Sequence, residues 1–175
     1  MRYYTADTHF NHKLFSQLRD FHDLDAHDKF LISTWNSFVT RKDEVYHLGD
    51  FCFGDHATVR RIRAQLNGHI HLILGNHDHK NRIHNIPGLF SSVSDIKQIT
   101  IEGNCVVLCH YAMRTWPSSH WNSWQLHGHS HGKLPSQGKQ YDVGIDNTGY
   151  RFLADYDIVE IMKNKPDNIN LIQSK

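Results

Sequence analysis

The 175-residue sequence has only three cysteines, Cys52, Cys105 and Cys109, and no two of them form a CxxC pair. An odd number of scattered cysteines does not support a disulfide framework, and a cysteine-type zinc site needs paired thiolates. The sequence therefore predicts reduced thiols, as expected for a cytoplasmic protein.

Long hydrophobic runs and a charge of one sign are also missing. No apolar segment approaches the roughly 20 residues of a membrane-spanning helix, and Met1–Asp7 lacks the apolar stretch of a signal peptide. The formal net charge is only +1, which gives no strong footprint for duplex nucleic acid or a membrane surface. We expect no membrane partner and a cytoplasmic location.

The composition is that of a globular domain. Hydrophobic residues make up 39% and charged residues 21% of the chain, and no repeat or low-complexity linker divides it. We predict a single domain over residues 1–175, with a polar, loosely held tail from about residue 163.

Short strands alternate with helical patterns, which is typical of an α/β fold. The expected strands are 2–6, 44–48, 69–74, 93–101, 105–109, 124–127 and 141–145. The expected helices are 26–39 and 55–67, with Asp55 as the cap of the second. Residues 155–162 fit either a helix or a strand.

Histidine is unusually frequent, with sixteen residues. Neutral imidazole is a common metal ligand, but the count alone is weak evidence. We expect ordinary surface positions for His22, His27, His56, His69, His71, His84 and His120.

Ligand-type residues follow the ends of successive predicted strands. They are Asp7, His9, Asp50, Asn76, His77, His110, His129 and His131. In open α/β sheets, ligands bind beyond the carboxyl ends of the strands. We therefore expect these side chains to meet at one edge of the sheet.

Each segment has an ordinary structural explanation when it stands alone. Asp7-Thr8-His9 and Gly49-Asp50 fit simple turns, and Asn76 fits the cap of a helix. His110 fits a structural position at a strand end, and His127 fits either a strand position or a contact with the ligand loop. Only the segments taken together favour a shared site.

Aspartate, histidine and asparagine without cysteine suit two divalent or trivalent metal ions, such as manganese, iron, zinc or nickel, of which we favour manganese. Asp50 can bridge two ions, and His129 and His131 can reach both from one short loop. Two ions about 3.5–4 Å apart form a clamp for in-line displacement at phosphorus. This chemistry predicts attack on a phosphate ester by a metal-bound hydroxide, with a nearby histidine handling the leaving group.

The order DxH, GD, GNHD, H, GHxH from Asp7 to His131 resembles the signature of the calcineurin-like metallophosphoesterases. Asp7–His12 and Val143–Asn147 are also similar to a small bacterial and phage subgroup known as predicted phosphoesterases. The resemblance implies a four-layer α/β/β/α sandwich with the site at one sheet edge.

The resemblance also implies roles for individual residues. The first metal would be held by Asp7, His9 and His131. The second would be held by Asn76, His110 and His129, with Asp50 bridging the two. His77 would be the general acid or transition-state stabiliser, oriented by Asp78.

The chain departs from the GDxxDRG pattern of the phosphoprotein phosphatases of this superfamily. Phe53 stands where the second aspartate would be, and the arginine is missing. This argues against a protein phosphatase. It favours a phosphodiesterase over a monoesterase, acting on small or nucleotide esters.

We predict substrate contacts at His12, Arg114 and Trp116. Arg114 fits a phosphate clamp or a solvent-facing side chain, and Trp116 fits a platform for a base or a packed core residue. The short chain leaves little room for a cap domain, so nucleotide and oligonucleotide esters are among the expected substrates. The sequence leaves monomer and homodimer open.

A non-catalytic metal-binding scaffold on the same fold is the main alternative, and a metallohydrolase acting on C–N bonds is another. The scaffold should have lost ligands or the catalytic histidine, and the second class does not require ordered GNHD and GHxH segments. All of these are present here, which favours the phosphoesterase.

Overall fold

The apolar strands of the N-terminal half come together in one sheet. The computed structural model describes residues 1–172. Its first sheet contains β1 (Arg2–Thr5), β2 (Glu44–His47), β3 (His69–Ile73), β4 (Ser92–Ser94) and β9 (Leu153–Ala154). The strand order is β4-β3-β2-β1-β9, in which only β9 runs antiparallel to its neighbour.

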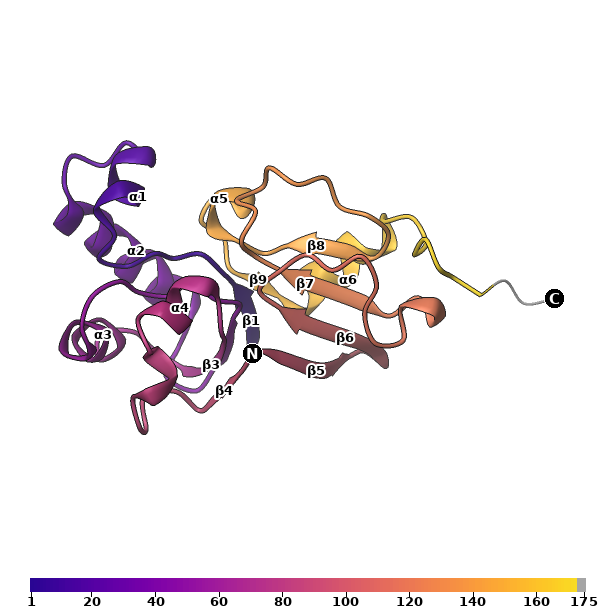
Figure 1. Ribbon diagram of the computed structural model, residues 1–175, viewed down its shortest axis with the longest axis horizontal. Coiled ribbons are helices and arrows are strands. Elements are labelled where there is room, and N and C mark those ends of the chain that lie inside the picture. Colours follow the sequence, from indigo (N-terminus) through magenta and orange to yellow (C-terminus); the bar gives the residue numbers. More distant parts are fainter. Residues whose placement is uncertain (173–175) are drawn as a thin grey trace.

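A second sheet follows in the chain, with the order β5-β6-β7-β8. Its strands are β5 (Ile96–Ile101), β6 (Asn104–Cys109), β7 (Trp124–His127) and β8 (Gln140–Asp142). Strands β5 and β6 form an antiparallel hairpin, and β6, β7 and β8 run parallel. Figure 1 shows the two sheets next to each other, with the N-terminal helices on the outer side of the first.

Two of the helices begin at aspartates whose side chains cap them. The helices are α1 (Lys13–Leu18), α2 (Leu24–Phe38), α3 (His56–Arg63), α4 (Asn76–Lys80), α5 (Ile145–Thr148) and α6 (Asp155–Lys163), with short 3-10 turns η1 (Ile83–Asn85) and η2 (Ser119–Trp121). The Asp23 carboxylate accepts the Ala26 N–H at the start of α2, and Asp55 accepts the Thr58 N–H at the start of α3. The predicted cap at Asp55 is confirmed.

Alternating side chains of the first sheet supply two hydrophobic cores. Val45 and Leu72 pack with residues of α2 and α3, including the fully buried Trp35. Leu48 and Ile73 point to the other face and pack with Val106, Leu108 and Leu126 of the second sheet, and α6 adds Ile158 and Met162 to this core. Burial of each large side chain contributes roughly 1.5–3 kcal/mol, so both faces of the first sheet are strongly held.

The predicted α/β character is confirmed, with two differences in the second half. The expected strand 93–101 is divided, because Ser92–Ser94 pairs with β3 of the first sheet and Ile96–Ile101 pairs with β6 of the second. The expected strand 141–145 ends at Asp142, and Ile145 begins α5. Residues 155–163, for which helix and strand were both open, form a helix, and the Asp157 carboxylate accepts the Ala154 N–H at its start. The patterns predicted neither α1 nor β9.

The prediction of a loosely held tail is wrong at Asn168, which is buried. Its side chain donates to the carbonyls of Ser119 and Ser123. Residues 173–175 lie outside the described part of the chain. Among residues 1–172, none of the helices has both the length and the apolar character needed to span a bilayer.

The carboxyl ends of strands from both sheets meet at one edge. Ala6, directly after β1, forms a bridge with Gly144, and its carbonyl accepts the Ile145 N–H at 3.1 Å. The Gly128 N–H, directly after β7, donates to the His110 carbonyl at 3.0 Å. The predicted ligand segments therefore lie next to one another.

Candidate metal centre

Five of the predicted ligands have a left-handed backbone. The φ angles are 57° at Asp7, 48° at His9, 55° at Asp50, 67° at His129 and 49° at His131. Residues other than glycine rarely adopt this region, and such strain gathers at functional sites, where the surrounding structure must hold it. Three backbone hydrogen bonds hold it here, from the N–H groups of residues 7, 9 and 10 to the carbonyls of residues 49, 50 and 51.

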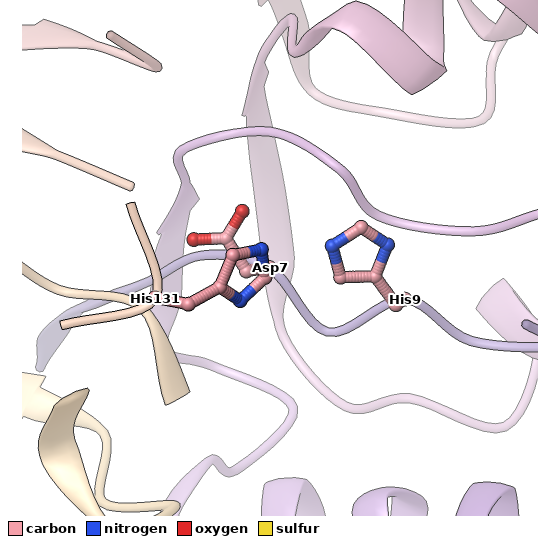
Figure 2. A group of neighbouring side chains, drawn as sticks. All are labelled: Asp7, His9 and His131. Carbon is pink, nitrogen blue, oxygen red and sulfur yellow. The ribbon is translucent and has the colours of Figure 1, made fainter. Parts of the chain in front are cut away.

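Asp7, His9 and His131 form the first ligand group. Each offers one ligand atom, and these atoms lie within 4.8 Å of one another. Figure 2 shows Asp7 and His9 on the N-terminal segment and His131 on a segment from the later half of the chain.

The first ligand group contains buried polar atoms without hydrogen-bond partners, namely Asp7 Oδ1 and both ring nitrogens of His9. Burial, together with the neighbouring Asp50, raises the pKa of Asp7 well above its ordinary value. Burial also lowers the pKa of His9, which favours the neutral ring that binds metals. Buried polar groups are normally paired, so these atoms fit a metal ion.

Asp50, His110 and His129 form the second ligand group, again with ligand atoms within 4.8 Å of one another. His110 Nδ1 lies 2.7 Å from the Leu48 carbonyl, which only accepts hydrogen bonds, so Nδ1 carries the proton. This leaves Nε2 free to face the site, where it lies 3.3 Å from Asn76 Oδ1. Asn76 therefore lies next to the second group.

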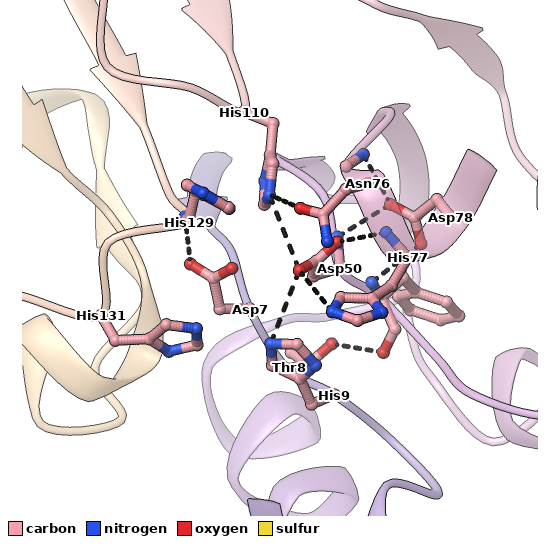
Figure 3. Close-up of polar contacts among 12 residues, drawn as sticks. Asp7, Thr8, His9, Asp50, Asn76, His77, Asp78, His110, His129 and His131 are labelled. Atoms are coloured by element: carbon pink, nitrogen blue, oxygen red, sulfur yellow. Dashed lines mark hydrogen bonds and ion pairs between the residues drawn. The ribbon is translucent and has the colours of Figure 1, made fainter. Parts of the chain in front are cut away.

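Asp50 stands between the two groups (Figure 3). Its Oδ2 atom lies 3.7 Å from His9 Nε2 in the first group and 3.6 Å from His110 Nε2 in the second. Its Oδ1 accepts the backbone N–H of His77 at 3.0 Å. This buried carboxylate has the position of a bridging ligand.

The prediction that Asp78 contacts and orients His77 is wrong. The Asp78 carboxylate instead accepts three backbone N–H bonds, from Asp50 at 2.8 Å, Phe51 at 3.0 Å and Gly75 at 2.9 Å. The reason is its place in the first turn of α4, where the side chain turns back to the helix start. Burial raises the pKa of Asp78 to about 7, although these N–H bonds favour the charged form. Asp78 thus joins the loops that follow β2 and β3.

His77 remains partly exposed beside the ligand groups. Its Nε2 lies 3.8 Å from Asp50 Oδ2, and its side chain is 30% exposed. The Phe53 ring lies beside it with 4.5 Å between centroids, and the His12 ring stacks on Phe53 with 3.6 Å between centroids. The predicted substrate contact His12 is therefore a neighbour of His77, and Phe53 supports both rings.

The structure does not place the other two predicted substrate contacts at the site. Trp116 is buried and its Nε1–H donates to the Ser123 carbonyl at 3.1 Å, so it packs and has no free face for a base. That prediction is wrong. Arg114 is exposed and lines a shallow pocket with Leu134 and Gln137, and this pocket includes none of the ligands. Pattern alone could not separate a packed tryptophan from an exposed one.

Several residues near the centre were not among the predicted site residues. His27, expected at the surface, is buried between Arg19 and Asp28. Tyr111 lies beside His129 with 4.9 Å between ring centroids, and its position after His110 was the only signal for it. His127 is buried and its Nδ1 lies 2.9 Å from the Gly128 carbonyl, which makes it a strand residue in contact with the ligand loop.

The comparisons with solved structures give the fold. No protein-family model matches the chain. A protein of unknown function from Aquifex aeolicus, AQ665, superposes with a TM-score of 0.69 over 92% of this chain and 98% of its own, with 22% identity. A predicted phosphoesterase from Streptococcus pneumoniae aligns with a TM-score of only 0.42 and 14% identity, too distant to indicate a shared function.

Two curated proteins are similar in sequence over most of their length. The uncharacterized protein MJ1445 of Methanocaldococcus jannaschii is 31% identical, over 85% of this chain and 84% of its own. The gene 66 protein of Mycobacterium phage L5 is 30% identical, over 90% of this chain and 93% of its own. At this identity and coverage, the chain belongs to the same family as these archaeal and phage proteins.

Proposed function

We propose that the protein is a two-metal phosphoesterase of the calcineurin-like type. The observation that carries the proposal is the pair of ligand groups with the buried Asp50 carboxylate between them. Asp7 and His9, two members of the first group, have buried side-chain atoms without hydrogen-bond partners. Ligand groups that share one carboxylate are the arrangement expected of a two-ion clamp on a phosphate.

The donor set fits two divalent or trivalent ions, with manganese favoured. The first would be held by Asp7, His9 and His131. The second would be held by Asn76, His110 and His129, with Asp50 common to both. When bound, such ions neutralise phosphate charge and make an attacking hydroxide available near neutral pH.

His77 is the residue we propose to act on the substrate itself. Its ring is partly exposed, and Nε2 lies beside Asp50 at the ligand groups. From this position a protonated ring can donate a hydrogen bond to a phosphate oxygen or a proton to the leaving oxygen. His12, held by Phe53, would contact the substrate next to it.

We favour a phosphodiester of a small molecule or nucleotide as the substrate. Phe53 occupies the place of the second GDxxDRG aspartate and supports the rings of His12 and His77 instead. The proposal extends to a cytoplasmic location and to the four-layer sandwich, in which α6 would be the outer layer on the second sheet's side.

A panel of esters tests the proposal. With manganese, bis-p-nitrophenyl phosphate should be hydrolysed faster than p-nitrophenyl phosphate, and cyclic nucleotides show whether nucleotide diesters are accepted. A clear preference for the monoester would overturn the diesterase assignment.

The variant His77→Ala separates the enzyme from a scaffold. It should lose about 10²–10⁴-fold in turnover and still bind manganese, because His77 is not one of the proposed ligands. A wild-type protein that binds manganese but hydrolyses no ester would support the scaffold instead. Turnover of amide substrates alone would support a C–N hydrolase.

A further inference from the structure

Arg19 is a buried arginine directly after α1, close to the first ligand group. Its side chain is only 4% exposed, and all five of its N–H groups have acceptors. One donor meets the Asp7 carbonyl at 2.7 Å and another meets the Thr8 carbonyl at 2.9 Å. Two more form a bidentate pair with the Asp146 carboxylate, each at 2.8 Å, and the last meets His27 Nε2 at 3.0 Å.

The Asp146 carboxylate connects Arg19 with a ligand from the other end of the chain. Its Oδ2 lies 2.6 Å from His131 Nδ1. The same carboxylate accepts the two bonds from Arg19. Because the charged carboxylate only accepts, His131 Nδ1 carries the proton and Nε2 is left for the ligand group.

His27 extends the same network to the far end of the strained loop. Since Arg19 only donates, His27 Nε2 accepts and its Nδ1–H donates to Asp28 Oδ1 at 3.0 Å. The Asp28 carboxylate in turn accepts the Asn11 N–H at 3.0 Å. Asn11 has a φ of 57°, like Asp7. The network therefore holds both ends of the loop 7–11.

We propose that Arg19 is a positioning residue that sets the geometry of the first ligand group, by fixing the loop 7–11 and the His131 ring as one unit. The proposal rests on the metal centre proposed above and adds the device that aligns it. Asp7 and His9 lie 122 or more residues before His131 in the sequence. Their alignment with His131 therefore needs a link between distant parts of the chain. A lysine has no planar fork and could not make these contacts together.

Manganese titration of the full-length protein without substrate tests this role. In Arg19→Ala and Asp146→Asn, the Kd of one of the two manganese ions should rise about 10–100-fold, the usual effect of removing a group that orients a ligand. Arg19→Lys should not restore the wild-type Kd. The double variant should lose less affinity than the two single effects combined, because both residues act partly through His131.

Arg2→Ala is the matched control. Arg2 also donates to a carboxylate, that of Asp155, and to a backbone carbonyl, that of Thr100. It contacts no proposed ligand, so its loss should lower the unfolding temperature and leave both manganese affinities unchanged.

Unchanged affinity for both ions in Asp146→Asn and Arg19→Lys, which are close in size to wild type, would overturn the proposal even if Arg19→Ala does not fold. Raising the manganese concentration should restore turnover in the Arg19 variants if the proposal is right. Because binding is measured without substrate, a wild type that binds two ions but hydrolyses nothing would count against the proposed reaction only.

Discussion

Asp50 belongs to the second ligand group and lies 3.7 Å from His9 of the first, but the two groups are supported in different ways. Around the first group, charged side chains position a ligand, since Arg19 pairs with Asp146 and Asp146 contacts His131. Around the second, the contacts are with the backbone, since Asp78 accepts three N–H bonds and His110 donates to the Leu48 carbonyl. The supports of the first group also join residues that are further apart in the sequence than those of the second.

Exposure differs between the supports rather than between the groups. The Asp146 side chain beside His131 is 22% exposed, whereas Asp78 is fully buried. The ligand groups themselves are alike, since each has two buried ligands and one that is exposed or half-exposed, His131 in the first and His129 in the second. We therefore expect Asp146 to tolerate substitution with a smaller loss of stability than Asp78.

The largest effect should come from Asp50, whose carboxylate lies near ligands of both groups. Asp50→Asn removes this charge, so it should weaken both manganese ions and reduce turnover by about 10²–10³-fold or more. Calorimetric titration and initial rates measure these quantities. A variant that lost only one ion would show that Asp50 belongs to one group and does not bridge.

The next largest effect is the difference in free energy of unfolding between His110→Ala and His131→Ala. The first empties a buried position and leaves the Leu48 carbonyl unpaired, so it should destabilise the metal-free protein by about 2–4 kcal/mol. The second removes a partly exposed ring and should change the free energy of unfolding by about 1 kcal/mol or less. Urea unfolding in EDTA makes the comparison, and equal losses would contradict it.

Alanine substitutions at two glycines, one near each ligand group, should give a smaller difference in stability. A Cβ at Gly75 would lie 2.6 Å from the Asp50 backbone nitrogen, so Gly75→Ala should cost about 1–3 kcal/mol and weaken metal binding. At Gly132 the nearest atom is 3.0 Å away on the Asn147 side chain, which can move. Gly132→Ala should cost about 1 kcal/mol, from its positive φ of 73°. Thermal unfolding of both variants tests this, and a larger loss at Gly132 would reverse the expected order.

The effect that is smallest at neutral pH concerns stability in acid. Burial lowers the pKa of His47, beneath the first group's loop, to about 3, and its Nε2 lies 2.9 Å from Thr8 Oγ1. The unfolded chain therefore binds a proton that the folded protein does not, and stability is lost as the pH falls from about 6.5 towards 3. His47→Gln should reduce this slope by up to about 1.4 kcal/mol per pH unit. Urea unfolding between pH 7 and pH 4 measures it, and an unchanged slope would show that His47 is not the group responsible.

Much of the centre could be predicted because ligands follow strands. Apolar runs such as 44–48 and 69–74 end at Asp50 and Asn76, and parallel strands bring their carboxyl ends to one edge. The supports could not be predicted in the same way. Asp78 was expected to orient His77, from their adjacency in sequence and from the family resemblance. The backbone partners of its carboxylate depend instead on how two loops meet.

The sequence by itself determined which donor atoms are available and in what order they follow the strands, since both are properties of local pattern. Only the tertiary structure decided which side chains hold those donors in place. Arg19 and Asp146 are 127 residues apart, and nothing local to either predicts that they pair. Trp116 likewise fits either a platform for a base or a core residue from its sequence, and the fold shows that it is buried. Hydrogen bonds and burial depend on distances that only the packed chain creates.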